Sequence, residues 1–178
     1  RSMDTAAFPV QMVNWFDSVE FCNKLSEKEG LKPYYDLTLE KRTGPSIDKA
    51  EVKILGGNGY KIPLDAEWTW ACTAGAKTKF HFGDDETKLV DYAWYNVKSD
   101  NRPHRVGEKK PNAYGLYDMH GNVREWNEEL TKADGDPVRV NRGGYWNHPA
   151  ASCAVSARSG NGPGTRSSTL GLRLVRVP

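Results

Sequence analysis

The sequence predicts an α+β domain with two helices, short strands and much irregular structure. Two segments in the first half show helical spacing of apolar residues, at 15–29 and 65–74. From residue 80 onward, Gly and Asn interrupt the chain every few residues, although Trp and Tyr recur. With 178 residues and 38% hydrophobic content, the chain can bury one sizeable core, so we expect a single domain over residues 1–178.

The first helix is expected over residues 15–29. Its apolar residues recur at three-residue spacing, as Phe16, Val19, Cys22 and Leu25. Asp17 or Ser18 can cap the start of this helix, and Gly30 can end it.

The second helix is expected over residues 65–74. Trp68 and Cys72 lie about one turn apart and therefore share a helical face. Pro63 precedes the segment and Gly75 follows it, as start and stop signals do.

Residues 31–62, between the helices, are predicted to form a hairpin-like insertion. Turn signals stand at 43–45 (Thr-Gly-Pro) and 56–59 (Gly-Gly-Asn-Gly), and β-prone runs stand at 52–55 and 60–62.

The second half has few regular elements. Two strand-like pieces are expected at residues 138–145 and 170–177, with a Gly-rich loop between them. The remaining backbone must satisfy its polar groups through side chains, turns, water or bound ions. A structural metal ion is therefore a natural expectation.

Charge and composition limit the classes of partner. The net charge of +2 arises from 25 basic and 23 acidic side chains interspersed along the chain, which does not indicate nucleic-acid binding. No apolar stretch approaches the roughly 18 residues of a membrane span. Cys22, Cys72 and Cys153 lack the spacing of a zinc site, and each is expected to be a small apolar core residue.

The stretch GLYDMHGNVREWNEE, at 115–129, carries the carboxylates of Asp118 and Glu125 on either side of Gly121. Hard cations such as Ca²⁺ bind carboxylate and backbone carbonyl oxygens, and a tight loop can turn carbonyls inward between two acidic side chains. Alternatively, the two carboxylates cap a turn and face solvent. The residues alone leave both interpretations open.

A second motif, NRGGYWNHPAASC at 141–153, contains a Gly pair that permits close backbone approach. His148 and Cys153 could share a soft metal such as Cu(I), or act as a base and a nucleophile. In the alternative that we favour, His148 lies in an exposed turn and Cys153 precedes a strand at 155–157.

The other polar candidates are histidines and arginines. Three histidines stand singly among turn residues and are expected at the surface: His81, His104 and His120. Three arginines lie beside apolar or glycine residues, where a charge needs a partner: Arg142, Arg158 and Arg173. They either bind an anionic ligand or hold buried backbone carbonyls, and we favour the second.

Four motifs follow one another in the second half: NAYGLYDMHGNVREW, RGGYWN, ARSGN and LGLR. Together with the upstream segments FPVQMVNWFDSVEFCNKLS and GYKIPLDAEWTWACTAG, they resemble the formylglycine-generating enzyme family, also called the sulfatase-modifying-factor domain. The resemblance covers almost the whole chain. It implies a variant of the C-type-lectin-like fold, with two helices, little regular strand and a large irregular part held by metal.

The resemblance also implies a calcium site. The family's calcium motif falls here on the side chains of Asp118 and Glu125 and on the carbonyls of Gly121 and Val123, which favours the metal-loop interpretation. A second calcium site of the family is not expected, because the Tyr-Ala pair at 92–93 is followed by a Trp and not by the Asn on which that site depends.

Catalytic members of the family bind Cu(I) through two cysteines after the Gly pair and oxidise a substrate cysteine to formylglycine. Those positions hold His148 and Cys153 here, so one thiolate is absent. Counted backward from Arg158, the loop is shorter than in the catalytic members, and Cys153 then falls on a non-catalytic position. Either count removes the thiolate pair of a linear Cu(I) site.

Two disulfides of the secreted enzymes are also expected to be lost. The family's partner positions for Cys22 and Cys72 hold Leu174 and Val155, respectively. The cellular compartment therefore stays undetermined.

Two further departures concern the start of the second helix and the start of the chain. The Thr usual before that helix is Leu64, which should weaken the cap by about 1 kcal/mol unless Asp65 substitutes. The family normally begins well upstream of Arg1, so we expect a separate N-terminal chain or a protein partner to complete the domain.

We therefore expect a non-catalytic, calcium-stabilised, lectin-like module that binds a carbohydrate, a peptide or a protein partner. Aromatic residues beside adaptable polar groups suit such recognition. The expected binding surface comprises Trp94, Tyr145, Trp146, Asn147 and His148. The alternative is a copper-dependent formylglycine-generating or related thiol oxidase that uses Cys153 with or without His148.

Overall fold

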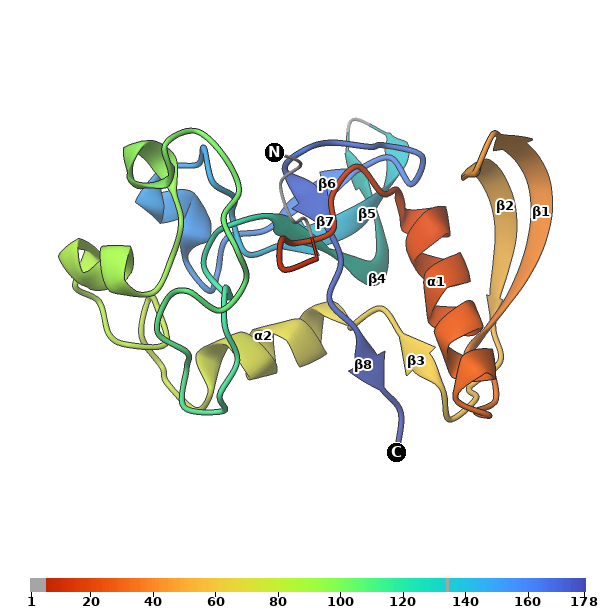
Figure 1. Ribbon diagram of the computed structural model, residues 1–178, viewed down its shortest axis with the longest axis horizontal. Helices are drawn as coiled ribbons and strands as arrows, with labels where there is room; N and C mark the ends of the chain where they lie inside the picture. The colour runs from red at the N-terminus through yellow and green to blue at the C-terminus, as the bar shows by residue number, and fades with distance from the viewer. Residues whose placement is uncertain (1–5, 134) are drawn as a thin grey trace.

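The computed structural model describes residues 6–133 and 135–178 and has a mixed α+β architecture (Figure 1). Its helices are α1 (Trp15–Lys28), α2 (Asp65–Thr73) and the short 3₁₀ helices η1 (Glu86–Asp91), η2 (Asn96–Ser99) and η3 (Ala150–Cys153). Its strands are β1 (Tyr35–Thr43), β2 (Ser46–Ile54), β3 (Tyr60–Lys61), β4 (Arg124–Ala133), β5 (Asp136–Arg142), β6 (Ser159–Asn161), β7 (Leu170–Gly171) and β8 (Val175–Arg176). No helix in the described part of the chain is long and apolar enough to cross a membrane.

Helix α1 forms as predicted, but its cap lies earlier than expected. The N-cap is Asn14, whose side-chain oxygen accepts a hydrogen bond from the Asp17 amide, while the Asp17 carboxylate accepts one from the Asn14 amide. This reciprocal pair is a capping box. Asp17 therefore closes the box from inside the helix, and neither Asp17 nor Ser18 is the cap residue.

Helix α2 also forms as predicted, and its N-terminus lacks a side-chain cap. Leu64 occupies the cap position in an extended conformation without a capping hydrogen bond. Asp65 does not substitute, because its carboxylate pairs with Arg142 and Arg158. The carboxylate of Glu129, from strand β4, instead accepts the Asp65 amide at 2.6 Å.

The predicted hairpin is confirmed over residues 35–54. Strands β1 and β2 pair antiparallel from Tyr35 opposite Ile54 to Thr43 opposite Ser46, with Gly44 at φ +58° in the turn. The hairpin lies along α1 in Figure 1. Strand β3 then pairs with β8, which joins this part of the chain to the C-terminus.

A four-stranded sheet in the order β6-β5-β4-β7 occupies the centre of the molecule (Figure 1). The predicted strand pieces at 138–145 and 170–177 correspond to β5 and to β7 with β8, whereas β4 was missed. Its polar sequence, REWNEELTKA, has no apolar alternation to predict a strand. The predicted strand at 155–157 was wrong, because these residues follow η3 in turns.

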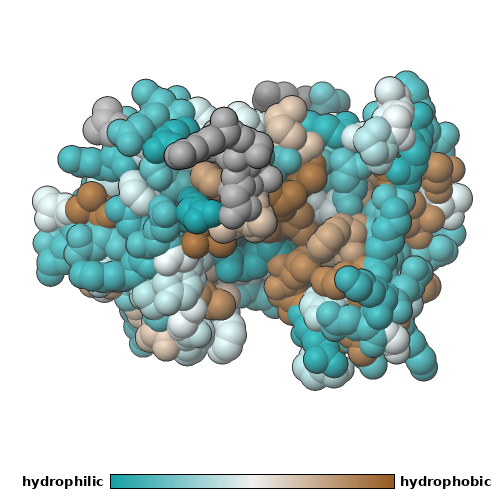
Figure 2. Space-filling view, in the orientation of Figure 1, coloured by the Kyte–Doolittle hydropathy of each residue, from teal (hydrophilic) through white to brown (hydrophobic). Residues whose placement is uncertain are grey.

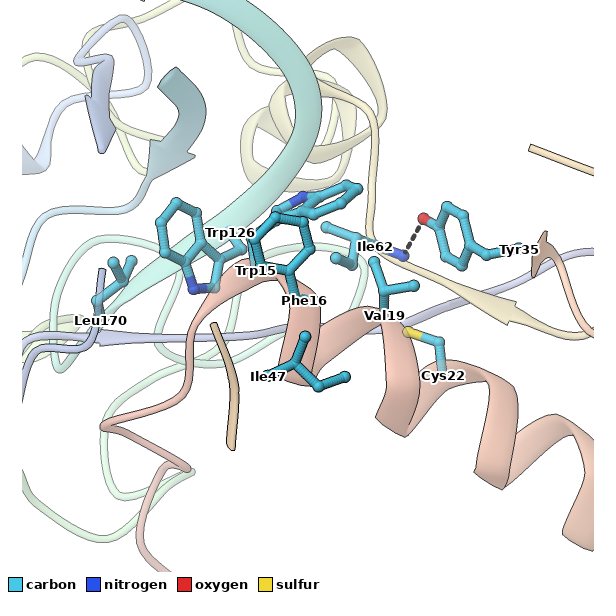
Figure 3. Packing of buried hydrophobic residues seen from close by; sticks show 9 residues of the cluster. All are labelled: Trp15, Phe16, Val19, Cys22, Tyr35, Ile47, Ile62, Trp126 and Leu170. Atoms are coloured by element: carbon cyan, nitrogen blue, oxygen red, sulfur yellow. Dashed lines mark hydrogen bonds between the residues drawn. The ribbon is translucent and has the colours of Figure 1, made fainter. Parts of the chain in front are cut away.

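The main core joins α1, the hairpin and the sheet (Figure 3). Its fully buried members include Trp15, Val19, Ile47 and Trp126, and in Figure 3 the Tyr35 hydroxyl accepts the Ile62 amide.

The three cysteines are free and buried, which confirms that both family disulfides are lost. Leu174 packs against the cluster that contains Cys22, and Val155 belongs to the cluster that contains Cys72. Apolar packing therefore occupies both positions where the resemblance implied covalent bonds.

Hydrophobic surface remains exposed beside α1. Figure 2 shows apolar residues gathered between α1 and the chain leading into β8, and the described groove there is lined by Val10, Val13, Phe21, Leu172 and Leu174. Phe21 is 49% exposed.

The uncapped start of α2 yields the first prediction. Leu64→Thr should give a higher free energy of unfolding than Leu64→Val by about 1 kcal/mol, because only the threonine hydroxyl can accept an amide of the first turn. Urea denaturation of both variants measures the difference. The two side chains have nearly the same shape, so equal stabilities would show that a hydroxyl at position 64 adds nothing to the bonds that Glu67 and Glu129 already accept from the Leu64 and Asp65 amides.

Candidate functional site

The pairing of β4 with β5 brings the two sequence motifs together. Glu125 lies opposite Arg142 in the antiparallel register, so the loop before β4 and the loop after β5 leave the sheet at the same end. The first loop carries Asp118 and Gly121, and the second carries the Gly pair at 143–144.

Asp118 is buried, with one carboxylate oxygen engaged and the other without a partner. Its Oδ2 accepts the Gly107 amide at 2.9 Å, while Oδ1 is buried without a described hydrogen bond. Burial raises the pKa of Asp118 above its ordinary value, and the nearby Glu125 charge adds to the shift. A positive charge beside Oδ1 would offset both effects.

Glu125 is buried and bound by three donors. The Arg173 guanidinium forms a two-pronged pair, with Nε to Oε2 and Nη2 to Oε1 both at 2.8 Å. The Trp68 indole nitrogen donates to Oε2 at 2.7 Å. These bonds fill Oε2, and a second acceptor direction remains on Oε1.

Two backbone carbonyls complete this group of oxygens. None of the hydrogen bonds described for residues 6–133 and 135–178 ends on the carbonyl oxygen of Gly121 or Val123. Asp118, Gly121, Val123 and Glu125 all line one cavity of about 470 Å³.

The loop geometry explains why Gly stands at position 121. A Cβ there would lie 2.4 Å from the Trp94 carbonyl oxygen, so the close approach excludes a side chain. The left-handed residues of the loop are Asp118 at φ +60° and Asn122 at φ +67°. Gly121 therefore permits close packing, and the sharp turning falls on its neighbours.

Cys153 is inaccessible. It is 0% exposed, at the end of η3, within a cluster that includes Phe80 and Leu89. A Cβ on Gly144 would lie 2.5 Å from the Cys153 sulfur, so Gly144 packs directly against the thiol. Burial raises the pKa of the thiol to about 12, which keeps it protonated at neutral pH.

His148 and Cys153 have different neighbours. The His148 ring lies 3.7 Å from the Tyr145 ring, centroid to centroid, and its Nδ1 is buried without a described partner. Burial, followed by the positive charge of Arg124, lowers the pKa of His148 to about 4. His148 is half-buried, so the predicted exposed turn is only partly correct.

The predicted binding residues belong to two groups of rings. Tyr145, Trp146 and His148 form one aromatic group, with exposed Asn147 between them in sequence. Trp94 instead stacks on His104 at 3.7 Å. Its ring is also covered by the Lys109 ammonium, at 3.7 Å from the centroid.

The surface prediction was wrong for His104 and His120, which are buried. His120 bonds to the Cys153 carbonyl through Nδ1 at 2.8 Å, and its Nε2 accepts the His81 amide at 3.3 Å. The turn residues next to His120 in the sequence do not predict that distant segments bury its ring. Burial lowers the pKa of His120 to about 4, so it is neutral in the fold.

The arginines bind two kinds of internal partner, backbone carbonyls and carboxylates. Arg142 donates to the carbonyls of Val155 and Ala157 and pairs with Asp65. Arg173 donates to the Tyr117 carbonyl as well as to Glu125. Arg158 pairs with Asp65 at 3.0 Å. The favoured prediction therefore holds for Arg142 and Arg173, but it omitted the carboxylate partners.

Arg124 is a candidate that the sequence reasoning missed. Consecutive strand residues point to opposite faces, so Arg124 and Glu125 face different cavities at the start of β4. The signal available in the sequence was an arginine between two predicted metal-site residues.

Comparison with known proteins identifies the family. The model of the sulfatase-modifying factor enzyme 1-like domain matches residues 1–178. The chain is 32% identical to "Chaperone protein LppX" of Paenibacillus barcinonensis, covering 94% of this chain and 69% of that protein. It is 30% identical to "Inactive C-alpha-formylglycine-generating enzyme 2" of Mus musculus, covering 65% of this chain and 42% of the mouse protein.

A solved structure shows the same architecture. "Treponema denticola variable protein 1" aligns with a TM-score of 0.83 and 36% identity, over 99% of this chain and 74% of that one. The predicted C-type-lectin-like fold of the formylglycine-generating enzyme type is thereby confirmed. The chain belongs to the sulfatase-modifying-factor family, whose members include the formylglycine-generating enzymes.

Proposed function

We propose that this domain is a non-catalytic, calcium-stabilised binding module of its family. The observation that carries the proposal is the environment of Cys153, whose thiol is protonated, fully buried and covered by Gly144. Nucleophiles and Cu(I) ligands need an accessible thiolate. The residues present do not fit a bis-thiolate copper site, because His148 occupies the other position and packs on Tyr145.

The names of two relatives support a binding role. One is described as an inactive formylglycine-generating enzyme and another as a chaperone, and both descriptions fit a domain retained without oxidase chemistry. The chain spans 69% of the chaperone and 42% of the inactive enzyme. That it shares the binding role of these longer proteins is therefore a proposal.

Calcium is proposed at the cavity before β4. The unpartnered Oδ1 of Asp118, the unbonded carbonyls of Gly121 and Val123, and the remaining acceptor direction of Glu125 Oε1 are hard oxygen donors around one space. Arg173 already neutralises Glu125, so the ion would chiefly compensate the buried Asp118 charge. Calcium supplies charge compensation there and holds the loop.

The proposed ligand surface is the aromatic group after the Gly pair. Tyr145, Trp146 and His148 offer ring faces and Asn147 an exposed amide, which suits a carbohydrate or peptide ligand. Trp94 is assigned a supporting role, because His104 and Lys109 cover its ring.

The first test of this proposal is an oxidase assay. Protein supplied with Cu(I) and oxygen should convert a sulfatase-type cysteine peptide to formylglycine no faster than its Cys153→Ser variant, because the thiol is buried and lacks a second thiolate. Mass spectrometry of the peptide measures the product. Turnover in the unmutated protein that Cys153→Ser abolishes would establish the copper-dependent alternative.

The second test is calcium removal. A chelator should lower the melting temperature by several degrees, about the shift that 1 kcal/mol produces in a domain of this size. Asp118→Ala should remove the difference between calcium and chelator, since it removes the unpartnered carboxylate.

The matched control for this test is Asp84→Ala. Asp84 lies in an exposed loop, and its carboxylate accepts the Lys79 amide. This variant also loses a carboxylate bound to a backbone amide, and it should keep the full calcium response. Equal melting of the unmutated protein with calcium and with chelator would contradict the site. The double variant Asp118→Ala with Glu125→Ala is less informative, because Glu125→Ala also leaves the Arg173 guanidinium without its carboxylate partner.

A further inference from the structure

A second cavity, of about 360 Å³, is lined by Arg124, the neighbour of Glu125 in strand β4. We call it the Arg124 pocket. Its lining residues come from β4, from the end of β5 with the Gly pair, from η3 and from β6, and they include Arg124, Asn141, Gly144, His148 and Ser159.

The lining carries positive charge without a carboxylate. Arg124, Arg142 and Arg158 all contribute to the wall, whereas no Asp or Glu does. Asp65, outside the lining, pairs with both Arg142 and Arg158. The single negative charge of Asp65 therefore offsets only one of the three positive charges, and an excess of positive charge remains.

Of the three arginines, Arg124 is the one whose charge no described carboxylate pairs with. In the described part of the chain no carboxylate forms an ion pair with it, and its Nε is buried without a partner. Its described polar contact is a hydrogen bond of 3.3 Å from Nη1 to the Ser159 hydroxyl, and its guanidinium carbon lies 4.8 Å from the Tyr145 ring centroid. A half-buried guanidinium held in this way is costly unless an anion joins it.

The other polar groups of the wall suit an oxyanion and its carrier. Ser152 and Ser159 hydroxyls can donate, and the buried Oδ1 of Asn141 and Nδ1 of His148 have no described partner. Guanidinium groups bind carboxylate, sulfate and phosphate through paired donors. The volume is within the range of small-molecule sites and exceeds what one inorganic ion needs.

We propose that the Arg124 pocket binds one oxyanion group, a carboxylate, sulfate or phosphate carried by a larger ligand, through the guanidinium of Arg124. The inference rests on the proposed binding function, because it names the chemistry that this surface recognises. Arg124 acts as the anchor, and Tyr145 holds its guanidinium in place from the side.

Titration with small oxyanions tests the proposal directly. Sodium sulfate, phosphate and acetate are added separately to ¹⁵N-labelled protein, with sodium chloride keeping the ionic strength constant. At least one anion should produce saturable shifts of the Gly143, Gly144 and Ser159 amides. The three arms distinguish planar carboxylate from tetrahedral sulfate or phosphate recognition. No saturable shift with any of them would overturn the proposal.

Single substitutions of arginine show whether the anion binds at Arg124. Arg124→Gln should weaken binding about tenfold or more, the loss typical of a charge-assisted hydrogen bond. Arg124→Lys keeps the charge without the fork and should bind with intermediate affinity. The matched control, Arg176→Gln, removes the same charge from exposed strand β8 and should bind as the unmutated protein does. Equal affinity of Arg124→Gln and Arg176→Gln would overturn the role of Arg124.

Folding of the variants is checked through their melting temperatures. Arg124→Gln should melt no lower than the unmutated protein without anion, because it removes an unbalanced buried charge. It should lose the rise in melting temperature that the bound anion gives. A sulfate-, phosphate- or acetate-induced rise of the same size in Arg124→Gln would contradict the proposal.

His148 provides a local readout, since its pKa is lowered to about 4 by burial and by Arg124. A bound anion should raise this pKa in the unmutated protein, and an NMR titration of the imidazole that shows no change at saturation would place the anion elsewhere. The oxidase assay separates the two proposals. Copper-dependent turnover would overturn the proposed function alone, whereas flat anion titrations would overturn this inference alone.

Discussion

The ion pair between Glu125 and Arg173 joins the parts of this fold that have little regular structure. Glu125 is the second residue of β4, Trp68 belongs to α2, and Arg173 lies between β7 and β8. Arg173 also donates to the Tyr117 carbonyl, in the loop that carries Asp118. One buried carboxylate thus connects the second helix, the central sheet, the C-terminal segment and the loop that carries Asp118. Removing either partner would leave an uncompensated charge in the interior, which is strongly destabilising.

The Gly pair after β5 sets the chemical character of the neighbouring surface. Gly143 and Gly144 both have positive φ, and Gly144 allows the loop to lie against the Cys153 sulfur. The same loop lines the Arg124 pocket. A backbone arrangement that closes off the thiol therefore opens a basic cavity next to it. The wall of this cavity carries guanidinium and imidazole groups, whereas the Cys153 thiol is buried.

Strand alternation separates two sites of opposite character. Glu125 faces the oxygen-lined cavity with Asp118, and Arg124 faces the basic cavity with His148. The two residues are adjacent in sequence, so a one-residue slip of β4 would turn Arg124 and Glu125 each to the other's face. The register at the start of β4 is set by two residue pairs, Glu125 with Arg142 and Trp126 with Asn141.

The two helices, the hairpin, the family and the loss of both disulfides can be predicted from the sequence, because they depend on local periodicity, turn residues and ordered motifs. Other features depend on contacts between distant parts of the chain and become visible only in the fold. The polar strand β4 exists because β5 and β7 pair with it on either side. His104 and His120 are buried because distant segments fold over them. Asp65 pairs with Arg142 and Arg158, whereas no carboxylate in the described part of the chain pairs with Arg124. Burial and charge balance are sums over residues far apart in sequence, so only the folded arrangement fixes them.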